Sequence, residues 1–153
     1  MDNLKYIKKL LKDHFNGEPW IDVNISGAVK NVSASEAAEK TQGLNSIWQI
    51  ANHMISWRLA LLARLKDKPV NVPDNNFIEE LNDTSEKAWA DTIKKFESSQ
   101  EDILSFLENS GDSMLEKVSP SSGYSYYELA VSIMLHDTYH LGQIVLIKKL
   151  LSK

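Results

Sequence analysis

Apolar residues recur at intervals of three and four along most of the chain, which is the spacing of one face of an α-helix. Four long segments show this pattern, and they cover residues 2–15, 47–66, 83–111 and 125–153. Their apolar stripes are Leu4, Ile7, Leu10 and Leu11; Ile47, Ile50, Met54, Trp57, Leu61 and Leu65; Trp89, Ile93, Phe96, Ile103, Leu104 and Leu107; and Leu129, Ile133, Leu135, Ile144, Ile147 and Leu151. The sequence therefore predicts four long helices.

Short polar motifs mark the starts of three of these helices. Each is a capping box, in which a first residue caps the helix and a residue three positions later reaches back to it. The pairs are Ser46 with Gln49, Asp83 with Glu86, and Ser125 with Glu128. The first helix instead shows its end, because Gly17 and Pro19 follow it.

The segments between the long helices contain turn-forming residues. Residues 20–25 alternate apolar and polar as a strand would, but no partner strand is predicted, so we expect an extended loop. Ser33 and Glu36 predict a short helix over residues 34–40. Loops are expected over residues 67–82 and 111–123. Together these elements predict an all-α fold, a four-helix bundle with one short extra helix, as a single domain over residues 1–153.

Composition narrows the range of functions. The chain is 42% apolar and 25% charged, which is ordinary for a soluble globular protein. Its formal net charge is −4 and its basic residues are scattered, so a nucleic-acid partner is not expected. It has no apolar run as long as a membrane span and no start like a signal peptide, so we expect a cytoplasmic protein without a membrane partner.

The chain contains no cysteine. Disulfides, a thiolate nucleophile and cysteine-ligated metal sites are therefore excluded. Any metal site must use His, Asp, Glu or water, and any thiol chemistry needs a thiol that a co-substrate brings.

Two of the four histidines, His136 and His140, lie four residues apart in the last predicted helix. This spacing places both imidazoles on one helix face, where they could share a metal ion, although it also arises by chance. His53 lies on or beside the apolar stripe of the second long helix and could face the pair, or be a hydrogen-bonded core residue. His14 lies at a helix end, where a structural or incidental role is expected.

The run from His136 to His140 is similar to the His-Glu-x-x-His motif of zinc proteases, with Asp137 at the position of the glutamate. We do not favour that interpretation, because aspartate is shorter and no His, Asp or Glu follows His140. A third protein ligand must therefore come from upstream. Of the two upstream histidines, His53 suits this role better than His14.

The chain resembles the DinB/YfiT-like superfamily. The resemblance is carried by S-I-W-Q-I-A-N-H at residues 46–53 and H-D-T-Y-H-L-G-Q-I at residues 136–144. It implies a four-helix bundle with up-down-down-up connectivity, a divalent metal ion held by three histidines, and often a homodimer. Carried over residue by residue, the implied ligands are His53, His136 and His140.

Three neutral imidazoles leave a metal coordination position open, as in catalytic sites. Imidazole ligands suit several metals, and we expect zinc or nickel first, with iron or manganese as alternatives. Gln143 could orient a ligand or be an amide on the helix surface, and Asp137 is a candidate general base. Trp57 and Tyr139 could line the pocket, although core packing is the role expected first for Trp57.

Three functions are consistent with these residues. Within the superfamily, the resemblance implies a small-molecule thiol S-transferase, acting on an electrophile with a low-molecular-weight thiol. The first alternative is a metal-dependent hydrolase that uses a metal-bound hydroxide. The second is a non-catalytic bundle that binds metal or acts as a dimeric interaction module.

Overall fold

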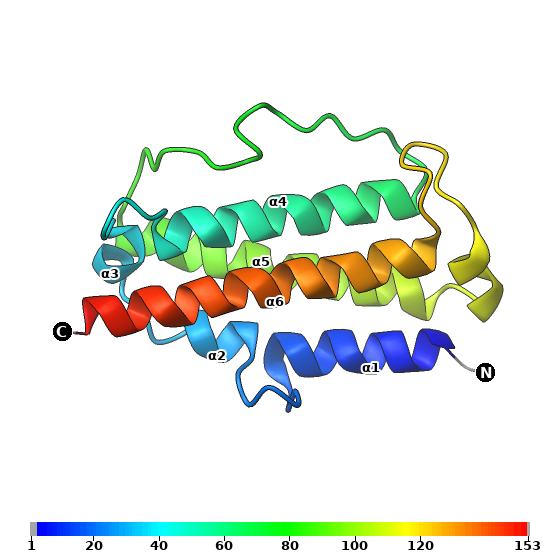
Figure 1. Cartoon of the computed structure of the whole chain (residues 1–153), viewed down its shortest axis with the longest axis horizontal. Helices are drawn as coiled ribbons and strands as arrows, with labels where there is room; N and C mark the ends of the chain where they lie inside the picture. Colours follow the sequence, from blue (N-terminus) through cyan, green and yellow to red (C-terminus); the bar gives the residue numbers. More distant parts are fainter. Residues whose placement is uncertain (1–2, 153) are drawn as a thin grey trace.

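The computed structural model describes residues 3–152, and this part of the chain is all-helical (Figure 1). Its long helices are α1 (Asn3–Asn16), α4 (Ile47–Leu65), α5 (Glu86–Glu108) and α6 (Tyr126–Leu151). Its short elements are α2 (Ile25–Val29), α3 (Ala34–Ala38) and the 3₁₀-helix η1 (Asp112–Glu116). None of these helices is long and apolar enough to span a bilayer.

Helix α4 packs against both α5 and α6 through their apolar faces. Helices α1 and α2 cover the other side of α6 (Figure 1). Two apolar clusters form the core. The first lies between α2, α3 and the facing parts of α4, α5 and α6, and it includes Trp48, Phe96 and Ile144. The second lies between the opposite ends of the long helices and includes Leu11, Leu61 and Leu107.

Buried polar side chains occupy the middle of the molecule, between the two apolar clusters. The set includes His53, Arg58, Gln100 and Asp137, each at most 4% exposed. Burial of such groups is costly unless they pair with one another. These buried polar residues, here called the polar layer, therefore indicate a role in function or in specifying the fold. The histidines lie in this layer.

The predicted capping boxes of α4 and α6 are present, as is that of α3. The start of α5 differs from the expectation. Its N-cap is Ser85, whose side chain accepts a hydrogen bond from the Ala88 backbone N–H. The prediction that Asp83 caps this helix was wrong. Asp83 instead accepts from the Ser85 N–H at 2.9 Å, which turns the chain into the helix.

Helix α2 was not predicted from the sequence. Residues 20–24 form the expected loop, but Asn24 then caps a helical turn by accepting from the Gly27 N–H at 2.7 Å. Burial of Ile25, Ala28 and Val29 against the core stabilises this turn. Ile25, predicted as the last residue of the loop, is therefore the first residue of a helix. Two residues of the predicted stripes are also exposed, Leu10 at 53% and Leu135 at 66%.

Candidate metal centre

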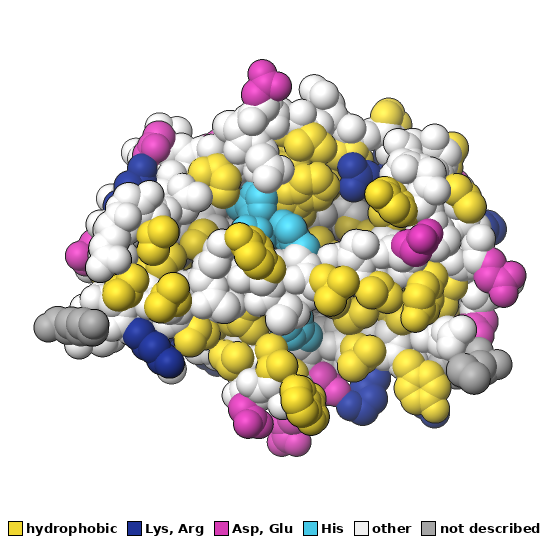
Figure 2. Space-filling view, in the orientation of Figure 1, with side chains coloured by type: hydrophobic (Ala, Val, Ile, Leu, Met, Phe, Trp, Pro, Cys, Tyr) yellow, Lys and Arg dark blue, Asp and Glu magenta, His cyan; other side chains and the backbone are white. Residues whose placement is uncertain are grey.

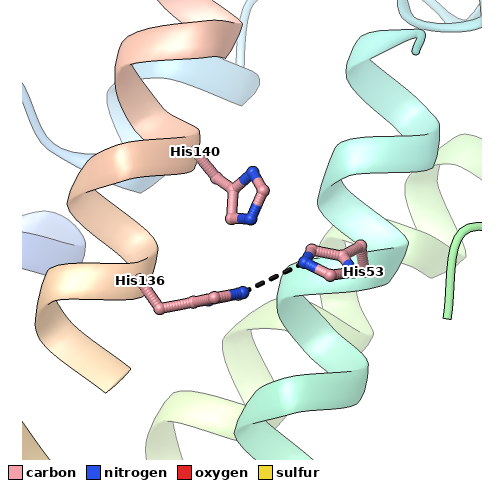
Figure 3. A group of neighbouring side chains, drawn as sticks. All are labelled: His53, His136 and His140. Atoms are coloured by element: carbon pink, nitrogen blue, oxygen red, sulfur yellow. Dashed lines mark hydrogen bonds between the residues drawn. The ribbon is translucent and has the colours of Figure 1, made fainter. Parts of the chain in front are cut away.

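The three histidines implied as ligands converge between α4 and α6 (Figure 3). His53 comes from the middle of α4, and His136 and His140 lie one turn apart on α6. One ring nitrogen of each lies within 4.8 Å of those of the other two. His53 Nε2 and His136 Nε2 lie 3.0 Å apart. These residues could therefore hold one metal ion together.

Burial favours the uncharged form of His53 and His140. It lowers the pKa of His53 to about 4, and the Asn76 carbonyl, which favours the protonated ring, only partly offsets this. Burial also lowers the pKa of His140, with Gln143 acting in the opposite direction. Neutral rings are the form that binds metal ions, so these two are ready as ligands near neutral pH.

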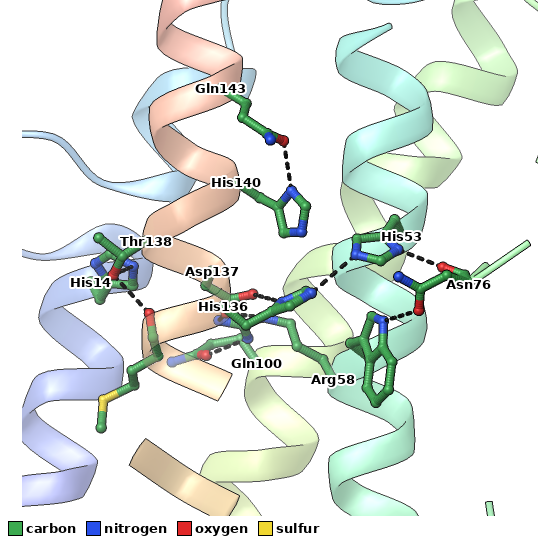
Figure 4. A network of polar contacts seen from close by, with 12 residues as sticks. His14, His53, Arg58, Asn76, Gln100, His136, Asp137, Thr138, His140 and Gln143 are labelled. Atoms are coloured by element: carbon green, nitrogen blue, oxygen red, sulfur yellow. Dashed lines mark hydrogen bonds and ion pairs between the residues drawn. The ribbon is translucent and has the colours of Figure 1, made fainter. Parts of the chain in front are cut away.

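Outer contacts decide which nitrogen of each ring carries the proton. His53 Nδ1 lies 2.7 Å from the Asn76 carbonyl oxygen, which can only accept, so Nδ1 carries the proton. His140 Nδ1 lies 2.8 Å from Gln143 Oε1, and the same argument applies. In both rings Nε2 therefore keeps its lone pair and points toward the centre (Figure 4).

For the third ring, His136, the outer contact is Asp137. Its buried Nδ1 lies 3.6 Å from Asp137 Oδ1, and neither atom has a hydrogen-bond partner. In the structure His136 Nε2 lies 3.0 Å from His53 Nε2, a hydrogen bond in which the His136 Nε2–H donates to the His53 lone pair. If the proton is instead on His136 Nδ1, which faces the carboxylate, both Nε2 lone pairs are available to a cation. The donor set therefore fits a divalent ion bound by three Nε2 atoms.

A buried ion pair between Arg58 and Asp137 lies next to His136. Arg58 and Asp137 are 1% and 0% exposed, and both Nε and Nη2 of Arg58 donate to Asp137 Oδ2 at 2.8 Å (Figure 4). Arg58 Nη1 also donates to Gln100 Oε1 at 2.7 Å, and Gln100 Nε2 donates to the Leu11 carbonyl at 3.0 Å. The guanidinium lies over the rings of Phe15, at 4.9 Å, and Phe96, at 5.5 Å. The network thereby joins all four long helices.

The loop between α4 and α5 covers the same face of α4 that carries His53. Gln49, His53 and Trp57 follow one another at intervals of four, and each bonds to this loop. Gln49 Nε2 donates to the Glu79 carbonyl at 2.8 Å, and Trp57 Nε1 donates to Asn76 Oδ1 at 3.2 Å. The 67–82 loop, which the sequence predicted only as a connection, is therefore part of the site.

A tight turn holds Asn76 in place. Asn76 and Phe77 both have left-handed backbone conformations, with φ of 52° and 59°, and the Ile78 N–H donates to the Asn75 carbonyl at 2.9 Å. Asparagine adopts this region readily, whereas a bulky residue such as phenylalanine does so at a cost. The turn directs the Asn76 carbonyl to His53 and its side chain to Trp57.

The site opens to the surface beside His136. Figure 2 shows histidine side chains in a hollow of this face, with hydrophobic and basic side chains next to them. The adjoining pocket has a volume of about 190 Å³ and is lined by Trp57, Leu61, Arg64, Leu129, Ser132, Ile133 and His136. The Trp57 ring lies 5.9 Å from the His136 ring, and both side chains line this pocket.

The fourth histidine lies apart from the cluster, on the α1 side of α6 (Figure 4). His14 Nε2 donates to Thr138 Oγ1 at 3.1 Å, since the Thr138 hydroxyl itself donates to the Met134 carbonyl. Burial lowers the pKa of His14. Its contacts agree with the structural role expected from the sequence.

The other residues that the sequence suggested, Gln143, Asp137 and Tyr139, differ in where they lie relative to the three histidines. Gln143 contacts His140 directly, whereas Asp137 is enclosed on the Nδ1 side of His136, away from the converging Nε2 atoms. Tyr139 is 67% exposed, with its ring 5.0 Å from that of His140.

Sequence reasoning missed Arg58, Gln100 and Asn76. A signal existed for two of them. Arg58 follows Met54 by four residues and Gln100 follows Phe96 by four, so both are polar residues on a buried stripe. No pattern pointed to Asn76, because its role depends on a loop folding back over α4.

A comparison with protein-family models matches residues 23–144 to the family described as the DinB superfamily. The matched span includes His53, His136 and His140, together with Arg58, Asn76, Asp137 and Gln143. No curated protein and no solved structure matches the chain.

Proposed function

The chain belongs to the DinB superfamily, and from this premise we propose that it is a metal-dependent small-molecule thiol S-transferase. His53, His136 and His140 would hold the divalent ion. The observation that carries the proposal is the convergence of three histidine ring nitrogens, two of them 3.0 Å apart, beside an open pocket. When bound, such an ion lowers the pKa of a coordinated thiol and so supplies a nucleophile near neutral pH.

The thiol comes from a co-substrate, since the chain has no cysteine. In the transfer, the thiol sulfur bonds to a carbon of the electrophile, the leaving group departs with its bonding electrons, and the thiol proton passes to solvent. Asn76 and Gln143 orient His53 and His140 through their Nδ1 atoms. Trp57 packs beside His136 and lines the pocket where a substrate would lie.

Metal content is the first test of this proposal. Untagged protein, never exposed to a nickel column, is analysed by mass spectrometry for metals beside His53→Ala, His136→Ala and His14→Ala. We expect about one divalent ion per chain in the wild type and in His14→Ala, because His14 lies outside the cluster. We expect loss of the ion in the other two variants. Absence of an ion after reloading with zinc, nickel and manganese would contradict the metal site.

Turnover is the second test. Metal-loaded protein is mixed with a low-molecular-weight thiol and a chromogenic electrophile. We expect product formation that depends on the thiol, is retained in His14→Ala and is lost in His136→Ala. Product formed equally well without the thiol would instead indicate a hydrolase. A metal-binding protein without turnover would indicate a binding bundle.

A further inference from the structure

The pocket beside His136 has apolar walls and one cationic group. Four apolar side chains from α4 and α6 form the walls, namely Trp57, Leu61, Leu129 and Ile133. His136 and Arg64 also line it, and both contact the Trp57 ring. An apolar cavity of ~150 Å³ holds a benzene molecule. A pocket of about 190 Å³ therefore has room for one ring or a short alkyl chain.

Arg64 differs from the other arginine of the chain in its partners. Arg58 is paired with Asp137, whereas no carboxylate among residues 3–152 forms an ion pair with Arg64. Arg64 is half-buried, and its Cζ atom lies 5.5 Å from the centre of the Trp57 ring. A partly desolvated guanidinium without an acidic partner is suited to bind an anion.

Trp57 connects the cation to the candidate metal centre. Its ring lies 5.9 Å from the His136 ring and 5.5 Å from Arg64 Cζ. Asn76 Oδ1 accepts from its indole N–H, and the Phe77 ring packs against it at 5.7 Å. A molecule lying along this fixed ring would reach from Arg64 to His136.

We propose that this pocket binds the apolar part of a small carboxylate-bearing substrate, whose carboxylate pairs with Arg64 while its reacting end lies at His136. The assignment rests on the proposed function, because it takes the three histidines as the reaction centre. Arg64 is then the residue that selects for substrate charge. A guanidinium and a carboxylate form two parallel hydrogen bonds, which a neutral amide cannot reproduce.

Binding of phenylacetate and of its neutral counterpart phenylacetamide tests the proposal. Titrations by NMR use wild type, Arg64→Gln and the control Lys66→Gln, which removes the same charge from an exposed residue at the end of α4. We expect the wild type and Lys66→Gln to bind phenylacetate at least tenfold more tightly than phenylacetamide, and Arg64→Gln to lose this preference. The Trp57 indole N–H signal, assigned with Trp57→Phe, should shift on binding.

The outcomes separate this proposal from the proposed function. Equal phenylacetate affinity in wild type and Arg64→Gln, no preference over the amide, or no binding would overturn the pocket assignment. Metal content measured on the same samples reports separately on the three-histidine site, and Arg64→Gln should retain its metal. If metal is absent but the Arg64-dependent preference persists, the proposed function fails while the anion-binding pocket remains.

Turnover identifies which substrate carries the carboxylate. With the electrophile fixed, 3-mercaptopropionate is compared with the neutral thiol 2-mercaptoethanol. With the thiol fixed, 4-(bromomethyl)benzoate is compared with its amide. We expect Arg64→Gln to raise KM about tenfold or more for one of the two carboxylates, with a smaller change in kcat. An unchanged KM for both would contradict a role of Arg64 in substrate binding.

Discussion

His136 and Asp137 present two buried polar atoms that face each other without a hydrogen bond, His136 Nδ1 and Asp137 Oδ1, 3.6 Å apart. Unpaired buried groups cost free energy, so their persistence needs a reason. A cation on the Nε2 side of the ring would make Nδ1–H a stronger donor toward the carboxylate. Asp137 therefore acts as a positioning residue for His136, and Arg58 positions Asp137.

The Arg58–Asp137 pair should dominate the stability of the middle of the molecule. Arg58→Met leaves a buried carboxylate unpaired, and we expect the free energy of unfolding to fall by about 3–5 kcal/mol. Replacing both residues, as Arg58→Met with Asp137→Leu, should recover most of this loss, because no charge is then buried alone. Urea unfolding measures both. A double variant no more stable than Arg58→Met would contradict the argument.

Metal affinity, unlike stability, should not recover in the double variant Arg58→Met with Asp137→Leu. In the double variant His136 has no carboxylate to hold its Nδ1 proton, so we expect the zinc dissociation constant to rise ~10- to 100-fold although the fold is restored. Competition with a chromophoric chelator measures the constant. His14→Ala, which changes a histidine outside the cluster, should leave it unchanged. Wild-type affinity in the double variant would show that Asp137 has no influence on the ligands.

At the scale of elements, α4 and the 67–82 loop form one unit. Gln49, His53 and Trp57, which lie four positions apart on α4, each bond to the loop, and His53 and Trp57 share one partner, Asn76. Because a backbone carbonyl orients His53, the orientation of this ring depends on the conformation of the turn as well as on the identity of the residue at position 76. The left-handed conformation of Asn76, with φ of 52°, is therefore a requirement of the site.

Two substitutions of Asn76 separate conformation from side chain. Asn76→Gly keeps the left-handed conformation and the carbonyl, so we expect zinc affinity close to that of the wild type. Asn76→Val disfavours positive φ and should displace the carbonyl from His53, which lowers zinc affinity about tenfold or more. The same competition assay measures both. Equal affinities for the two variants would show that the carbonyl does not orient His53.

At the scale of the whole molecule, the polar layer divides the apolar core and joins the four long helices. Burial lowers the pKa of three histidines, His14, His53 and His140, and so favours their neutral form. An unfolded chain has histidine pKa values of about 6.5. Below that pH the unfolded state binds more protons than the folded state, so acid destabilises the fold.

Stability of the metal-free protein should therefore depend on pH in a definite direction. The contribution of His53 is fully present above pH ~6.5 and is lost progressively as pH falls toward its folded-state pKa of about 4. We expect the urea midpoint to fall between pH 7.5 and pH 5, and to fall less in His53→Leu. A midpoint that is constant or rises on acidification would contradict this. With metal bound the fall should be steeper, because protons compete for the ligands.

The sequence by itself determined the elements whose signals are local. Periodicity and capping boxes placed the long helices to within a few residues, and the spacing of His136 and His140 on one helix followed from the helical repeat. The resemblance carried by residues 46–53 and 136–144 added His53, and the structure brings it to that pair. The up-down-down-up connectivity and the homodimer stay predictions.

Only the tertiary structure decided what surrounds the histidines. The Arg58–Asp137 pair joins residues 79 positions apart, and the Asn76 carbonyl reaches His53 across 23. The pocket at Trp57 and Arg64 likewise forms only where α4 meets α6. Such contacts depend on how helices pack and how a loop folds back, whereas helical periodicity reports only which face of a helix is buried. For this reason the candidate ligands could be read from the chain, but the groups that orient them could not.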